Sequence, residues 1–166
     1  MLATESAHSS SRSLLSGLLA LLVVAAAASL GFLATIPNIS PWYDELAKPA
    51  FNPPNAIFGP VWMALYVLMA YAFWRVLRLR GETLARRAAI WLFLAQLALN
   101  ALWSFLFFGA HSPVMGLADI VPQWLLIVAT VAAFLPLDRR AALALVPLAV
   151  WVAFAGALNF AVWRLN

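Results

Sequence analysis

Four apolar stretches of this chain carry aromatic or polar side chains at every third or fourth position. Residues spaced in this way lie on one face of an α-helix. Inside an apolar helix, polar side chains tend to face the interior of a helix bundle, because contact with hydrocarbon is costly. The faces therefore predict an amphipathic, aromatic pocket with carboxamide groups and one carboxyl. Their residues are Phe58, Trp62, Tyr66 and Met69; Gln96, Asn100, Trp103 and Phe107; Asp119 and Gln123; and Trp151, Ala155 and Asn159.

The polar members of these faces leave two interpretations open. Gln96, Asn100 and Asn159 can simply hydrogen-bond between helices, at about 0.6 kcal/mol each on average, or they can bind a ligand. Asp119 lies near a helix end, where its carboxyl can reach interfacial water. The alternative is a deeper position against Asn100 or a ligand amine.

The chain has eight tryptophans, and they fall into two groups. Trp42, Trp74 and others suit the aromatic belts at membrane interfaces. Trp62, Trp103 and Trp151 share faces with the polar residues instead. Large flat side chains around a cavity suit large flat ligands, because offset stacking adds about 0.5–1.5 kcal/mol beyond the burial of area.

The elements that hold these residues are membrane-spanning helices. The chain has 166 residues, of which 66% are hydrophobic and 10% charged, against roughly 45–50% and 25% in soluble domains. Five runs reach the length of about 20 apolar residues that a spanning helix needs. The sequence predicts an all-α, integral membrane bundle of five helices in a single domain, residues 14–166, after a disordered serine-rich tail, residues 1–13. The runs are near 14–36, 57–77, 88–108, 114–135 and 141–163.

Small residues recur on one face of the fifth run. Such stripes allow close approach of helix backbones. We favour packing within the bundle over packing between two chains. The stripe consists of Ala149, Ala153, Ala157 and Ala161.

Positive charge predicts the orientation of the bundle. Arginines cluster before the first run and in the second and fourth connections, whereas the opposite side carries only Lys48 and Arg164. By the positive-inside rule the N-terminus faces the cytoplasm and the first connection faces the other side, in what we expect to be a bacterial cell membrane. Because the arginines flank membrane spans, they do not indicate a nucleic-acid surface.

The sequence indicates no metal site. The absence of cysteine excludes disulfides, thiolate metal ligands and a cysteine nucleophile. His8 and His111 lie apart, and neither is accompanied by another ligand. His111 could touch an iron porphyrin, but we favour a solitary loop histidine.

The first connection, Trp42–Pro54, combines aromatic residues, an acidic pair, one lysine and several prolines. Prolines fix φ and remove hydrogen-bond donors. We therefore expect an ordered, non-helical loop that closes the pocket.

These residues resemble a known family, the tryptophan-rich sensory proteins and the related mitochondrial translocator protein, also called the peripheral-type benzodiazepine receptor. The resemblance covers nearly all of the chain after the tail. The motifs that carry it are Trp42–Pro49, Asn52–Pro54, Phe58–Trp62, Leu99–Gly109 and Trp151–Asn159.

The resemblance implies a dimeric five-helix bundle that binds porphyrin or haem, sterol-like lipids, and isoquinoline or benzodiazepine ligands, with no required cofactor. The role that we expect is a membrane sensor or regulator of tetrapyrroles. Phe160 stands where a tyrosine of the sterol-binding pattern is required, which argues against tight sterol binding. With the spacing of the helix faces, the expected ligand-binding residues are Tyr43, Pro53, Phe58, Trp62, Tyr66, Asn100, Trp103, Asp119, Trp151, Ala155 and Asn159.

Two other functions stay open. One is an enzyme that degrades porphyrin with light or oxygen, for which Trp62 and Trp151 are the redox candidates. The other is a tetrapyrrole or lipid transporter, although five spans do not divide evenly into the repeats of many transporters.

Overall fold

The computed structural model describes residues 2–166, with side chains from residue 13 onward. No strand occurs in this part of the chain, and each of five helices is long and apolar enough to cross a membrane. The predicted all-α five-helix membrane fold is therefore confirmed. The long helices are α1 (Leu2–Thr35), α2 (Asn55–Leu77), α3 (Leu84–Ser104), α4 (Pro113–Phe134) and α5 (Arg139–Leu165).

Three short helical turns extend these helices at one end of the bundle. A 3₁₀ turn, η1 (Ile36–Asn38), and a kinked turn, η2 (Ile39–Tyr43), follow α1, and a π-turn, η3 (Phe105–Gly109), follows α3. Trp42, Tyr43, Asp44 and Glu45 are thus helical, so the expectation of a non-helical connection is wrong for these four residues. Pro41 does not prevent the turn, because a proline near the start of a helix lacks only an N–H that needs no partner there.

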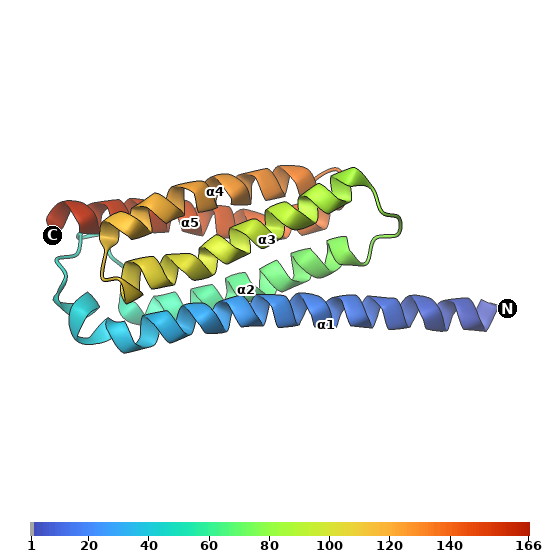
Figure 1. Ribbon diagram of the computed structural model, residues 1–166, viewed down its shortest axis with the longest axis horizontal. Coiled ribbons are helices and arrows are strands. Elements are labelled where there is room, and N and C mark those ends of the chain that lie inside the picture. Colours follow the sequence, from blue (N-terminus) through green and yellow to red (C-terminus); the bar gives the residue numbers. More distant parts are fainter. Residues whose placement is uncertain (1) are drawn as a thin grey trace.

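The helices form a closed ring around the bundle axis. α1 packs against α2 and α3, α4 packs against α3 and α5, and α5 closes the ring against α2. Figure 1 shows the nearly antiparallel arrangement, with α1 extending beyond the other helices at its N-terminal end. The arginine-rich connections lie at one end of the ring, and η1, η2 and the C-terminus lie at the other.

Helix α1 starts earlier than the sequence predicts. It begins at Leu2, so the segment for which a disordered tail was expected is helical in this structure. Residues 2–12 contain neither glycine nor proline, the two residue types that most strongly oppose a helix interior.

Side-chain caps set the starts of three helices. Thr83, Ser112 and Asp138 accept hydrogen bonds from backbone N–H groups in the first turns of α3, α4 and α5. The last turn of α2 is capped by Arg86, whose guanidinium donates to the carbonyls of Val76 and Leu77 at 3.1 and 2.7 Å. These caps satisfy N–H and C=O groups that a helix leaves unpaired at its ends.

An aromatic stack closes the bundle toward the arginine-rich end. The rings of Phe73 and Phe93 are nearly parallel with centroids 4.3 Å apart, and Phe134 stacks on Phe93 at 6.0 Å. Met69 and Ile127, fully buried, belong to the same core. This half of the bundle is therefore solidly packed.

The alanine stripe of α5 does not pack inside the bundle along its whole length. Ala153 and Ala157 are exposed, so the interpretation of internal packing is wrong for these two residues. The inward face of α5 is formed by larger side chains, among them Leu148, Val152 and Leu158, which leave the small residues outside.

Candidate ligand-binding site

A cavity of about 320 Å³ lies between the five helices in the half of the bundle that contains η1 and η2. Small-molecule sites usually have volumes of about 300–1,000 Å³. Every long helix contributes to the wall, and most of the wall is apolar or aromatic. The ring of helices thus encloses a space suited to a small organic ligand.

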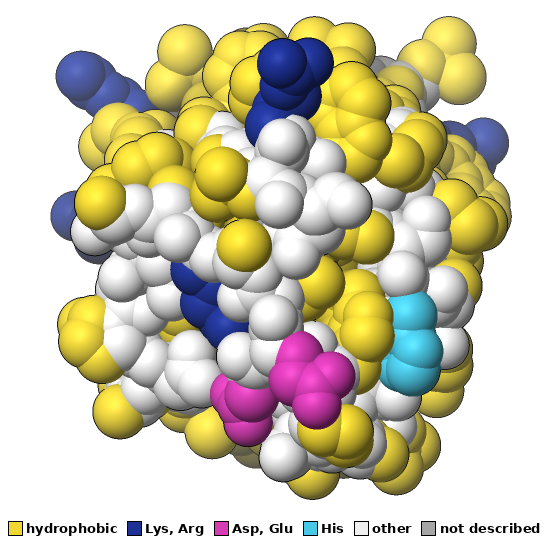
Figure 2. All heavy atoms as spheres, turned by 90° about the vertical axis from the view of Figure 1, so that its left-hand side faces the viewer, with side chains coloured by type: hydrophobic (Ala, Val, Ile, Leu, Met, Phe, Trp, Pro, Cys, Tyr) yellow, Lys and Arg dark blue, Asp and Glu magenta, His cyan; other side chains and the backbone are white. Residues whose placement is uncertain are grey.

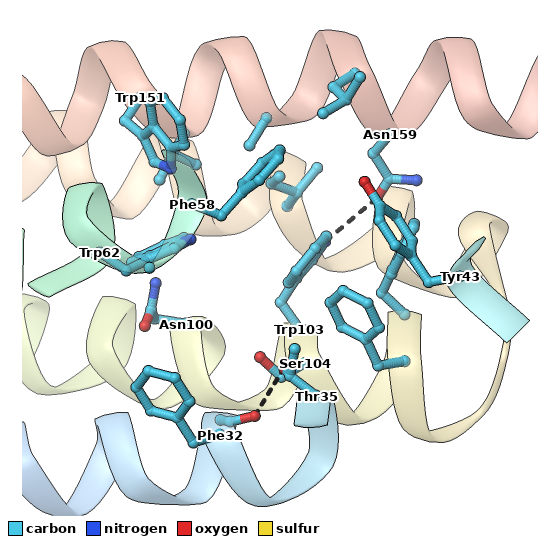
Figure 3. A pocket seen from close by; sticks show the side chains of 18 of the residues that line it. Phe32, Thr35, Tyr43, Phe58, Trp62, Asn100, Trp103, Ser104, Trp151 and Asn159 are labelled. Atoms are coloured by element: carbon cyan, nitrogen blue, oxygen red, sulfur yellow. Dashed lines mark hydrogen bonds between the residues drawn. The ribbon is translucent and has the colours of Figure 1, made fainter. Parts of the chain in front are cut away.

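Two indole rings from different helices converge on this cavity. Trp62 of α2 and Trp151 of α5 both point into it (Figure 3). Phe58 meets Trp151 edge-on with centroids 5.9 Å apart, and Tyr66 lies against Trp62 at 5.5 Å. The aromatic faces can therefore contact a flat guest from more than one side.

The carboxamide of Asn100 is oriented by the neighbouring helix. The hydroxyl of Tyr66 donates to Asn100 Oδ1 at 3.0 Å. Asn100 is 4% exposed and lines the cavity. With its oxygen engaged by Tyr66, the amide nitrogen of Asn100 is the atom that can donate to a ligand.

Asn159 links three helices at the side of the cavity nearer the C-terminus. Its Oδ1 accepts from Trp103 Nε1 at 3.2 Å, and its Nδ2 donates to the carbonyl of Pro113 at 2.8 Å. The Trp103 ring also stacks on Phe107 with centroids 4.8 Å apart. Gly116 permits this packing, because a Cβ there would lie 2.8 Å from Asn159 Oδ1.

Two buried hydrogen-bond donors of the wall have no partner among the residues that the structure describes. They are Nε2 of Gln123 and Nε1 of Trp151, and both side chains line the cavity. A buried donor without a partner costs about 1–3 kcal/mol. A ligand that presents acceptor atoms at this depth would remove that cost.

The connection between η2 and α2 lies at the end of the bundle that holds the cavity, between the lining residues Tyr43 and Asn55, and we call residues 44–54 the lid loop. Lys48 holds its first part: the ammonium donates to the carbonyls of Tyr43, Asp44 and Leu46 at 2.6, 3.2 and 3.2 Å. The same ammonium lies 4.5 Å from the centre of the Tyr43 ring. Figure 2, which faces this end, shows a basic side chain set among backbone atoms beside acidic ones.

Two further contacts fix the surroundings of the lid loop. The carboxamide of Asn166 pairs with both backbone groups of Ala47, at 3.0 and 3.1 Å. Trp42 stacks on His111 with centroids 4.7 Å apart, and His111 Nε2 lies 2.8 Å from Asn38 Oδ1. Hydrogen bonds of Lys48 and Asn166 thus hold the lid loop. His111 is exposed at the surface and does not line the cavity.

Most of the residues expected in the site share this cavity. Pro53 and Asp119 do not line it. Pro53 lies in the lid loop and accepts a hydrogen bond from Asn52 through its carbonyl. The expected residues that do line the cavity are Tyr43, Phe58, Trp62, Tyr66, Asn100, Trp103, Trp151, Ala155 and Asn159.

Asp119 is 5% exposed, and its Oδ2 has no partner among the described residues. The interpretation that the Asp119 carboxyl reaches interfacial water therefore does not hold, because the side chain is buried. Asp119 lies at the level where α4 and α5 pack closely, since Gly116 adjoins Asn159 and Gly156 adjoins Ile120. This close packing separates the carboxyl from the cavity.

Sequence reasoning missed one wall of the cavity, the one built by α1 and η1. Its residues carry no polar periodicity, and the only signal was the small residue Gly31, against which Ser104 packs. Gln123 and Phe107, which spacing had placed on polar or aromatic faces, also line the cavity. The missed residues of this wall are Ala28, Gly31, Phe32, Thr35, Ile36 and, at the start of η2, Ile39. Elsewhere in the lining, Asn55, Gly59, Ser104, Phe108, Ile120, Val152, Leu158 and Val162 were not expected either.

The fold and the cavity define an integral multi-pass membrane protein of five helices with an internal aromatic pocket. The model of the TspO/MBR family matches residues 19–164. The chain belongs to this family, and its membership supports a role as a membrane sensor or translocator.

Several characterised relatives are similar over most of their length. The chain is 43% identical to the Tryptophan-rich protein TspO of Chlorobaculum tepidum, over 78% of this chain and 83% of that protein. It is 41% identical to Protein CrtK of Rhodobacter capsulatus, over 85% and 88% of the two chains. The human Translocator protein is 38% identical over 75% of each chain.

Proposed function

We propose that this protein is a membrane sensor that binds a tetrapyrrole, porphyrin or haem, in the cavity beneath the lid loop. The observation that carries the proposal is the convergence of Trp62 and Trp151, from two helices, on one internal cavity. A planar macrocycle presents large faces to these rings, and each offset stack adds about 0.5–1.5 kcal/mol beyond area burial.

The polar groups of the wall suit the edge of such a ligand. Porphyrins carry carboxylates, which are acceptors, and the cavity offers N–H donors from Gln123, Trp151 and Asn100. A donor that is unpaired in the free protein gains most from a ligand acceptor, because its desolvation cost is already present. These groups would hold the edge of the ligand while the indoles hold its faces.

Sterol-like lipids and benzodiazepine or isoquinoline compounds are further ligands under this proposal, since most of the wall is apolar. Phe160 is 50% exposed and does not line the cavity. Its departure from the sterol-binding pattern therefore concerns the outer surface of α5 and not the cavity.

Orientation and assembly complete the proposal. We place the arginine-rich end in the cytoplasm of a bacterial cell and the lid loop on the opposite side, in keeping with the positive-inside rule. We also propose a homodimer, which the resemblance to the family implies.

A fluorescence titration tests the site. Quenching of tryptophan emission by protoporphyrin gives the affinity of the wild type. The variants Trp62→Ala, Trp151→Ala and Ala155→Leu should each weaken binding about tenfold or more, the first two by loss of stacking and the third by intrusion into the cavity.

Matched controls come from the outer surface of the bundle. Trp91 is 70% exposed and Ala153 faces outward, so Trp91→Ala and Ala153→Leu should leave the affinity unchanged. Wild-type affinity in all three cavity variants would show that the ligand binds elsewhere.

A further inference from the structure

A second hollow lies on the outer surface of the bundle, between α2 and α5. It is a shallow groove of about 720 Å³ with an apolar lining. Ala64 and Pro147 contribute small side chains to its floor and rim, and the indole of Trp151 separates it from the internal cavity. The lining residues are Val61, Ala64, Leu65, Leu68, Val146, Pro147, Val150, Trp151 and Phe154.

Helix α5 starts with two arginines that have no acidic partner among the described side chains. Arg75 of α2 pairs with Asp138 at the start of α5, with 2.7 Å between Nη2 and Oδ2, and this ion pair joins the two helix ends. Glu82 pairs with Arg87. Among the side chains of residues 13–166, no carboxylate pairs with Arg139 or Arg140, and both are exposed. The guanidinium of Arg78 lies 4.8 Å from the centre of the Trp74 ring, and Trp74 donates to the carbonyl of Ser13, so Arg78 lies on the side of α2 that faces α1.

The groove and the two arginines at the start of α5 belong to one continuous surface. On α5, Val150, Val146, Leu143 and Arg139 follow one another at intervals of three or four residues and are exposed, so they share one face. Eleven residues separate Arg139 from Val150, or about 16 Å of helix. This distance is about half of the hydrocarbon thickness of a bilayer, the depth that one lipid leaflet occupies.

We propose that this surface binds one anionic phospholipid. The lipid phosphate contacts Arg139 and Arg140, and an acyl chain lies in the groove as far as Trp151. Unpaired arginines at the membrane interface attract anionic headgroups, whereas a zwitterionic lipid brings a cation that opposes them. The charges of Arg75 and Arg87 are already balanced by Asp138 and Glu82.

A second copy of this chain fits the surface less well. Two copies related by a two-fold axis along the membrane normal would meet through the same patch. The unpaired arginines of one copy would then face those of the other at the same depth, and like charges repel. The charge of the patch therefore favours lipid over a second protein.

Native mass spectrometry of the detergent-solubilised protein tests the proposal. The probes are phosphatidylglycerol and phosphatidylcholine with identical acyl chains, added at equal concentration. The wild type should retain one phosphatidylglycerol in preference to phosphatidylcholine. Since each interfacial arginine contributes about fivefold, Arg139→Gln/Arg140→Gln should reduce the preference more than tenfold and each single variant about fivefold.

Two further variants separate the parts of the site. Arg80→Gln/Arg164→Gln changes the net charge equally but lies off this surface, so it should keep the wild-type preference. Ala64→Trp fills the groove and should weaken both lipids equally, and a thermal scan of each variant confirms that it is folded.

An unchanged preference in Arg139→Gln/Arg140→Gln would overturn the proposal. So would an equal loss in Arg80→Gln/Arg164→Gln, because the effect would then be that of net charge alone. A dimer cross-linked between cysteines placed at Val146 of each copy, at the same lipid concentration, would assign the groove to a second copy instead.

Discussion

At the scale of single residues, Asn159 of α5 forms hydrogen bonds to two other helices inside the bundle. Its carboxamide accepts from Trp103 of α3 and donates to the first carbonyl of α4, while its backbone belongs to α5. The hydrogen bond from Tyr66 to Asn100 joins only two helices. The two sites therefore allow a comparison between a double and a single interhelical link.

We expect Asn159→Ala to lower the free energy of unfolding by about 1–3 kcal/mol, because it leaves the buried Trp103 N–H and the Pro113 carbonyl unpaired. Tyr66→Phe should cost only about 0.6 kcal/mol, the mean for one interhelical hydrogen bond. Unfolding in mixed micelles of increasing denaturing detergent measures both. Equal losses in the two variants would contradict this ranking.

At the scale of elements, Asp138 ties the start of α5 to the end of α2. Burial by itself disfavours its charged form, but hydrogen bonds from the Arg75 guanidinium and from the backbone N–H groups of Ala141 and Arg140 outweigh burial and hold the pKa of Asp138 below its ordinary value. A carboxyl with a lowered pKa in the folded state stabilises the fold fully above its unfolded pKa of about 3.9. That contribution is lost as the pH falls through the folded pKa.

Asp138→Asn should therefore destabilise the protein at pH 7 by about 1–2 kcal/mol, because it replaces a charge-assisted hydrogen bond with a neutral one. The difference from the wild type should shrink as the pH is lowered below about 4. Thermal scans in a mild detergent at several pH values measure it. Glu82→Gln, which removes an exposed pair, is the control and should show no change at any pH.

In the lid loop, one side chain, Lys48, makes three of the hydrogen bonds that hold the first part of the loop. Lys48→Met keeps the length of the side chain but removes the donors to three carbonyls. Under the proposed function, we expect protoporphyrin to dissociate about tenfold faster, because a hydrogen bond to a charged group contributes about 1.5–3 kcal/mol. Stopped-flow fluorescence measures the rate.

The helical bundle should not change in this variant, since Lys48 contacts only the lid loop and η2. Glu45→Gln alters an exposed residue of the same loop and should leave the dissociation rate unchanged. A slower or equal rate in Lys48→Met would mean that the loop does not retain the ligand.

At the scale of the whole molecule, the two ends of the bundle differ. The cavity lies in the half of the bundle nearer the lid loop, whereas the stack of Phe73, Phe93 and Phe134 fills the bundle toward the arginines. The cavity therefore does not continue along the bundle axis past this aromatic stack. This arrangement favours a binding protein over a transporter with a path along the bundle axis.

Proteoliposomes test this difference directly. Protoporphyrin flux into vesicles that contain the protein should equal the leak of protein-free vesicles, while quenching in the same vesicles shows that the site is intact. Faster flux would favour the transporter. Light-dependent loss of porphyrin, abolished in Trp62→Phe and Trp151→Phe variants that still bind, would favour the enzyme.

Much of the architecture could be predicted from the sequence, because the bilayer imposes a simple rule on it. A spanning helix needs about 20 apolar residues, so composition and run length predicted five helices and their order. Polar and aromatic residues at helical spacing also marked much of the cavity wall. In a membrane such residues avoid lipid, so their spacing reports an inward face, as at Asn100 and Asn159.

Only the tertiary structure decided which apolar residues face the cavity, the core or the lipid. Phe32 lines the cavity, Phe93 is buried in the core and Leu33 is exposed, yet their local sequence contexts are equally apolar. Asp119 and Gln123 share a helix face, but close packing of α4 on α5 admits only Gln123 to the cavity. Hydropathy cannot separate these environments, since each is free of water, and the difference arises from the way that neighbouring helices pack.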